Sequence, residues 1–303
     1  MPHLEVQRSR SRSKWAFFIA VVAGGWLCLP QAATIQPFSA DISHRARGVF
    51  PGEAVLVRVV PSAPVTEIRG DIFDETVRFY PADGAAWQGL VGVDLMVEPG
   101  AYDLTLLMRP VGSAPVERAY PLTVAHKAYP TRQLTVAPRY VEPPTDVRAR
   151  IAREAQEQQA IFASASTDRL WRGPWGVPVS GRATSAFGSR SVFNGQSRSP
   201  HSGADFRAAE GTSVVAPNVG RVVLTGDTYF SGGSVILDHG WGLYSYFAHL
   251  SKILVEKGDL IERGQAVGLA GATGRVTGPH LHWTLRMNGA RVDPLSLVEL
   301  LAE

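Results

Sequence analysis

Short apolar runs, many of them alternating with polar residues, recur along most of this 303-residue chain and are separated by glycine and proline turns. In its first part, the runs that are typical of strands lie at 54–60, 90–97, 102–108 and 119–124. Turn signals such as Pro51-Gly52 and Asp83-Gly84 stand between them. Short strands at this spacing predict an accessory domain over 34–137 that is a small β-sandwich, immunoglobulin-like in general shape.

A similar pattern returns over 179–303, with glycines at nearly every junction. The runs that predict strands lie at 213–215, 220–224, 234–237, 243–247, 265–269 and 280–285. Short strands joined by tight turns predict a compact antiparallel β-sheet domain. The predicted fold class is therefore all-β.

The segment at 138–178 has a different pattern and predicts a linker with one helix. Thr145 can cap a helix over 146–164, in which apolar residues recur at helical spacing. Glutamate and glutamine fill the other sides, so we expect this helix to pack on one of the two domains.

A leader covers residues 1–33. Four basic residues between Arg8 and Lys14 precede an uncharged run at 15–29, which is shorter than the about 20 residues of a membrane-spanning helix. The pattern predicts a signal peptide, with an uncleaved N-terminal anchor as the alternative. Either predicts an exported protein, periplasmic or in the cell envelope, that contacts a membrane only through the leader. The single cysteine, Cys28, lies here, so we expect no disulfide.

Composition and charge add little beyond this. The chain is 45% apolar and 19% charged, which is typical of globular proteins. Its net charge of +3 equals the excess of four basic residues over one acidic residue within the leader, so the remainder is neutral. We therefore expect no nucleic-acid partner, and we expect a monomer.

The candidate chemistry lies in the last third of the chain. His280 and His282 are two apart in a predicted strand, so both leave the same face, about 7 Å apart along the backbone. One can bind a metal ion while the other reaches the water on it. His201 and Asp205 are four apart and would be about 13 Å apart on a straight strand. The chain must bend after Pro200 if the two are to share one ion.

Two further histidines differ in their context. His249 follows alternating aromatic residues at a predicted strand edge, where a lone histidine is more often structural. The four other polar positions of the same pattern count against that interpretation. His239 matches no such position, and we take it as a turn residue. Three protein ligands and a position left for water are how proteins build a catalytic zinc site.

The order and spacing of these residues resemble the lysostaphin/LytM-type zinc metallopeptidases, which are peptidoglycan endopeptidases. The resemblance covers roughly 178–300. It includes the segments 184–190, 201–205, 216–220, 246–250, 271–274 and 278–282. It implies one Zn²⁺ held by His201, Asp205 and His282, with His249 and His280 as the catalytic residues. No motif position is replaced, which argues against relatives that have lost zinc ligands and act as activators.

The resemblance implies a zinc-dependent endopeptidase that hydrolyses peptide cross-links of bacterial peptidoglycan, with its stem peptides as partner. D-Ala–diaminopimelate cross-links are the expected substrate, and a polyglycine bridge is the alternative. The alternative function is a non-catalytic cell-wall-binding or amidase-activating protein. A latent enzyme, blocked by its first domain, its helix or the loop around Phe193, is a third possibility.

The sequence leaves two points open. It does not assign the role of general base to either His249 or His280. Four aromatic residues are candidates both for the cleft and for the core: Trp175, Phe187, Phe230 and Tyr246.

Overall fold

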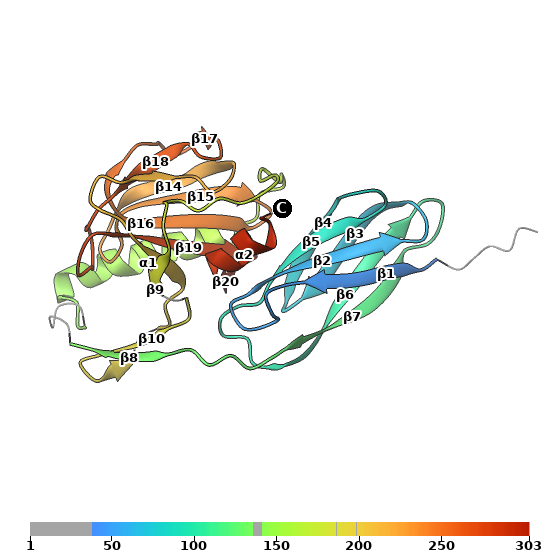
Figure 1. Ribbon diagram of the computed structural model, residues 1–303, viewed down its shortest axis with the longest axis horizontal. Coiled ribbons are helices and arrows are strands. Elements are labelled where there is room, and N and C mark those ends of the chain that lie inside the picture. The colour runs from blue at the N-terminus through green and yellow to red at the C-terminus, as the bar shows by residue number, and fades with distance from the viewer. Residues whose placement is uncertain (1–37, 136–140, 186, 198, 303) are drawn as a thin grey trace, which may run out of the picture. The chain divides into compact units, whose positions relative to one another are not determined.

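The computed structural model describes residues 38–135, 141–185, 187–197 and 199–302 (Figure 1). The predicted leader and its cysteine lie outside these residues. The first part of the chain forms seven strands, in the order β1-β2-β5-β4-β3-β6-β7, and each pairs with antiparallel neighbours. Their bounds are β1 Ala40–Arg45, β2 Ala54–Pro61, β3 Val65–Ile72, β4 Glu75–Pro81, β5 Trp87–Gly92, β6 Gly100–Pro110 and β7 Val116–Val124.

Strand β4 joins two layers of this region. It pairs with β3 through residues 75–78 and with β5 through residues 79–81. Alternate side chains of the strands, such as Val57, Leu106 and Leu122, are fully buried in one shared core. The all-β prediction is confirmed, and the closer likeness to an immunoglobulin domain stays a prediction.

The strand predicted over 90–97 extends five residues beyond the end of the observed strand. β5 ends at Gly92, and the chain turns at Asp94, whose carboxylate accepts a hydrogen bond from the Met96 N–H at 2.8 Å. The same carboxylate pairs with the Arg291 guanidinium at 2.6 Å. A short acidic side chain that binds the backbone two residues on favours a turn.

Between residues 125 and 182, the described part of the chain forms one strand and two helical elements. β8 (Thr131–Leu134) pairs in parallel with β10 (Arg190–Phe193), which also pairs with β11 (Gln196–Ser197). A 3-10 turn, η2 (Thr145–Val147), leads into α1 (Arg148–Phe162). The predicted cap is wrong, because Thr145 lies within η2 and neither helical element has a side-chain cap. The predicted domain boundaries at 137 and 178 stay predictions.

The rest of the chain builds a sheet in the order β17-β14-β15-β16-β19-β12-β9, in which all the described strand pairs are antiparallel, as predicted. β13 pairs with β18, which also pairs with β16, and β20 pairs with β19. The bounds are β9 Ala183–Ser185, β12 Gly203–Arg207, β13 Ser213–Val215, β14 Gly220–Thr228, β15 Gly232–Gly240, β16 Leu243–Ile253, β17 Leu260–Ile261, β18 Ala266–Ala270, β19 His280–Met287, β20 Ala290–Val292 and the closing helix α2 Pro294–Leu300.

The two faces of this sheet differ, and the difference positions the site. On one face, Phe206, Phe247 and Trp283 are buried in the larger hydrophobic core. On the opposite face, α1 covers one part, where Phe162 packs edge-on against Tyr244 with ring centres 5.7 Å apart. The neighbouring part of that face carries polar side chains of β12 and β19. We call it the site face.

Candidate active site

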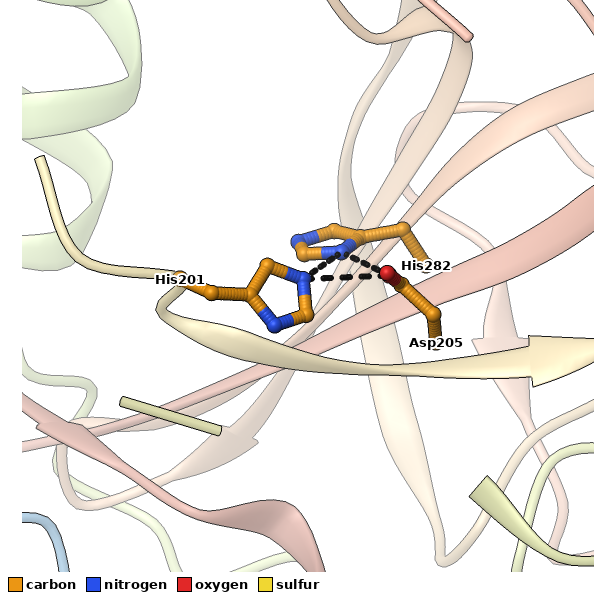
Figure 2. A group of neighbouring side chains, drawn as sticks. All are labelled: His201, Asp205 and His282. Atoms are coloured by element: carbon orange, nitrogen blue, oxygen red, sulfur yellow. Dashed lines mark hydrogen bonds and ion pairs between the residues drawn. The ribbon is translucent and has the colours of Figure 1, made fainter. Parts of the chain in front are cut away.

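Two histidines and one aspartate converge on the site face (Figure 2). His201 Nε2 lies 3.1 Å from Asp205 Oδ1 and 3.1 Å from His282 Nδ1, and the latter two atoms are 2.7 Å apart. A zinc tetrahedron with bonds of about 2.1 Å has edges of ~3.4 Å, close to these distances. The donor set of two nitrogens and one carboxylate oxygen therefore fits a zinc ion.

Strand register explains how distant residues meet here. In the β12–β19 pair, Asp205 lies directly opposite His282. His201 lies just before β12, where its N–H donates to the Ser189 carbonyl at 2.9 Å and its own carbonyl accepts from the Gly188 N–H at 2.8 Å. These backbone bonds hold the bent segment that the four-residue spacing requires.

Gly203 is needed at the start of β12. A β-carbon at Gly203 would lie 2.6 Å from the Trp283 carbonyl oxygen and 2.7 Å from the His282 ring, closer than van der Waals contact allows. Glycine is therefore the residue that lets the two strands approach closely enough to bring Asp205 to His282.

Thr284 orients the His282 ring, and the sequence patterns did not single it out. The Thr284 hydroxyl is buried and lies 2.9 Å from His282 Nε2. With a metal ion bound, Nε2–H would donate to this oxygen and leave the Nδ1 lone pair for the ion, whereas without one Nδ1–H can donate to Asp205. Because Thr284 is two residues beyond His282 on β19, the strand period was the available signal.

The electrostatics of the cluster favour an ionised carboxylate. Burial alone would raise the pKa of Asp205, but hydrogen bonds from His201 and His282 outweigh it and hold the pKa well below its ordinary value. The three side chains remain 17–22% exposed, so solvent or a ligand can reach them.

Two more imidazoles stand beside this cluster. The rings of His249 and His280 have centres 4.7 Å apart, and His280 Nε2 lies 4.0 Å from Asp205 Oδ1. Each Nδ1 lies 2.9 Å from a backbone carbonyl, that of Thr273 for His249 and that of Gly278 for His280. A carbonyl only accepts, so each Nδ1 donates a proton to it, and Nε2 is the ring atom left to face the cluster.

A β-bulge aims the His249 side chain. His249 lies within β16, which continues to Ile253, and not at a strand edge as predicted. The pairing register with β15 shifts beside it, its φ is +65°, and its N–H donates to the Ser231 carbonyl at 2.8 Å. Positive φ is unfavourable for a non-glycine residue, and such bulges redirect side chains next to functional sites. Burial lowers the pKa of His249 to about 4, although its bond to Thr273 opposes the shift.

The structure corrects the prediction for His239. It is not a turn residue but is fully buried in β15, with Nδ1 donating to the Val219 carbonyl at 2.7 Å and Nε2 2.9 Å from the Ser245 hydroxyl. Its ring packs against Trp175. These contacts give it a structural role in the core.

Of the aromatic candidates for the cleft, Trp175, Phe187 and Tyr246 are buried. Phe230 is partly exposed and stacks under the Arg275 guanidinium at 4.4 Å. Within the described part of the chain, no helix has the length and apolar character needed to cross a bilayer.

Comparisons with known proteins agree with this geometry. The profile of Peptidase family M23 matches residues 199–294. The peptidoglycan DD-endopeptidase ShyA of Vibrio cholerae serotype O1 is 39% identical over 141 residues, which cover 46% of this chain and 33% of ShyA. The DD-carboxypeptidase/endopeptidase Mpg of Neisseria meningitidis serogroup B is 38% identical over 97 residues, 32% of this chain and 22% of Mpg. The chain thus covers a third or less of the length of these curated relatives.

A longer match comes from a solved structure. A Pseudomonas aeruginosa protein, described as a peptidase M23, has a crystal structure that aligns with a TM-score of 0.60 at 31% identity. The alignment covers 84% of this chain and 96% of that one, so it extends well beyond the segment that carries the candidate ligands. On this evidence the chain belongs to peptidase family M23.

Proposed function

We propose that this protein is a zinc-dependent endopeptidase that hydrolyses peptide cross-links of bacterial peptidoglycan. The observation that carries the proposal is the convergence of His201 Nε2, Asp205 Oδ1 and His282 Nδ1 beside two further imidazoles. These three residues are the proposed zinc ligands. They contribute one negative charge, so bound zinc would keep positive charge to polarise a carbonyl group and acidify a water molecule.

His249 and His280 are the proposed catalytic residues. The Nε2 atom of one ring accepts a proton from the attacking water, and the other ring orients that water through a hydrogen bond. The water oxygen bonds to the carbonyl carbon, the peptide C–N bond breaks, and the imidazolium returns its proton to the leaving amine. The carbonyls of Thr273 and Gly278 hold both rings in the tautomer that this step requires.

Two relatives support the proposed substrate. ShyA is named a peptidoglycan DD-endopeptidase, and Mpg a DD-carboxypeptidase/endopeptidase. Because glycine has no D configuration, these names favour a D-Ala–diaminopimelate cross-link over a polyglycine bridge. The stem peptides of peptidoglycan are then the partner, and the predicted leader would deliver the protein to them in the periplasm or cell envelope.

Digestion of defined cross-linked muropeptide dimers tests the proposal. The zinc-loaded wild type should convert dimers into monomers, as measured by mass spectrometry, and a chelator should stop the reaction. His249→Ala should keep its zinc but lose about 10²–10⁴-fold in turnover, the usual weight of one acid–base group. Wild-type protein that leaves both diaminopimelate and polyglycine cross-links intact would count against hydrolysis and favour a non-catalytic wall-binding or amidase-activating protein.

A further inference from the structure

Arg207 is the last residue of β12 and lies on the site face. Ala204 and Phe206 of the same strand are each 1% exposed and belong to the hydrophobic core. Because side chains alternate along a strand, Asp205 and Arg207 project from the opposite face. Arg207 is two residues beyond Asp205, so their β-carbons are about 7 Å apart.

The neighbouring strand places Arg207 beside the proposed catalytic pair. Arg207 is the register partner of His280 in the β12–β19 pairing. Directly opposite residues in antiparallel strands have β-carbons about 4.5–5.5 Å apart. The Arg207 side chain thus starts from the same patch of the sheet as the ring proposed to act on the scissile bond, and is long enough to reach a substrate there.

The guanidinium of Arg207 is open to a ligand. Arg207 is exposed, and no carboxylate of the described residues lies within 4.0 Å of it. Arg286, on the same face, is half-buried and stacks on the Phe162 ring at 5.1 Å. Arg275 stacks on Phe230 at 4.4 Å. The planar fork of an arginine matches a carboxylate through two parallel hydrogen bonds.

We propose that Arg207 binds the substrate carboxylate that stands next to the scissile bond on its amine side. This inference rests on the proposed function. In diaminopimelate, the amine that D-Ala acylates and a free carboxylate are attached to the same carbon, so an anion lies close to the scissile nitrogen. A glycine–glycine bond has a neutral amide there. Arg207 therefore sets the preference of the site for diaminopimelate cross-links.

A matched pair of D-Ala–diaminopimelate dimers tests this role, one with that carboxylate free and one with it converted to a carboxamide. The zinc-loaded full chain should cleave the free-acid dimer with a kcat/KM about tenfold higher or more, mainly through a lower KM, as expected for a hydrogen-bonded charge. Arg207→Gln should remove this preference by slowing cleavage of the free acid alone. Arg207→Lys should keep part of it, because lysine keeps the charge but not the fork.

Arg221→Gln is the control for a changed net charge. Arg221 is an exposed residue of β14, which β15, β16 and β19 separate from β12, so this variant should keep the full preference. The role of Arg207 would be overturned if the wild type cleaved both dimers equally, or if Arg207→Gln lowered kcat/KM equally for both dimers. Either result would leave the proposed endopeptidase activity in place. Wild type that cleaves neither dimer would overturn the proposed function itself.

Discussion

The seven-stranded sandwich (β1–β7) and the second sheet, which carries the candidate site (β9 and β12–β20), both bring ionisable side chains together, but they arrange them differently. In the sandwich, Glu53 is 1% exposed, and its carboxylate accepts hydrogen bonds from Arg47 at 2.9 Å and from Lys127 at 2.7 Å. On the site face, the Asp205 carboxylate meets two imidazole nitrogens that also lie 3.1 Å from each other. The first group joins opposite charges, and the second brings three potential metal-ligand atoms to one point.

This difference shows what distinguishes a structural cluster from a candidate site. Two cations complete the network around Glu53, so its buried charge is compensated within the protein. The cluster around Asp205 stays 17–22% exposed and suits a cation from outside. The kinds of atoms that meet, and not the number of ionisable groups, make the second cluster a candidate metal site.

Replacing one carboxylate in each region should separate the two roles most strongly. Asp205→Ala should remain folded but lose most of its zinc affinity. This loss should be far larger than the about 10–100-fold fall in affinity that follows when a ligand loses only its hydrogen-bond partner. Glu53→Gln should keep its zinc and lose about 2 kcal/mol of unfolding free energy. That is less than the about 3–5 kcal/mol of a fully buried pair, because Arg47 and Lys127 stay partly exposed. Metal analysis measures the zinc content, and denaturant unfolding measures the stability. A Glu53→Gln variant that is folded but binds no zinc would contradict the separation between a structural cluster and a metal site.

His239 should make the stability of the metal-free protein depend on pH. Burial lowers its pKa from 6.5 to about 4, even though the Val219 carbonyl opposes the shift. Between these values the unfolded chain binds a proton that the folded ring does not, so stability falls as pH decreases. The loss attributable to His239 reaches about 3 kcal/mol near pH 4 and is absent at pH 7.

The control for this pH effect is His239→Gln, which has no titrating ring at that position. Other histidines contribute to both proteins, so the measured quantity is the difference in unfolding free energy between wild type and variant. That difference should change by about 3 kcal/mol between pH 7 and pH 4, in the direction that favours the variant in acid. A difference that stays constant over this range would mean that the buried ring titrates normally.

Thr284→Val should have the smallest of these effects. The substitution keeps the volume but removes the oxygen that accepts from His282 Nε2–H, so the ring is no longer held with Nδ1 toward the ion. Zinc affinity should fall by about 10–100-fold in a competition titration with a chelator. Thr284→Ser keeps the hydroxyl and should stay near wild type. Equal affinities for valine and serine variants would show that Thr284 does not orient the ring.

Several features of the site could be predicted from the sequence because they depend on local geometry. The two-residue period of a strand places His280 and His282 on one face, as β19 shows. The bend between His201 and Asp205 followed from the reach of an extended chain. Apolar runs located β2, β6 and most strands of the second sheet, whereas β1, β3 and β4, in which polar residues dominate one side, were not predicted.

The amino-acid sequence by itself determined the strand periodicity and the glycine turns, because these depend on neighbours along the chain. It also singled out five candidate site residues, through their order and spacing and through the resemblance to a known family. Only the tertiary structure decided that Thr284 orients His282, that a bulge aims His249, and that His239 is buried rather than in a turn. It also decided that Arg207 stands opposite His280. Each of these contacts joins strands or loops that local patterns do not align, because register and burial are set by the packing of the whole sheet.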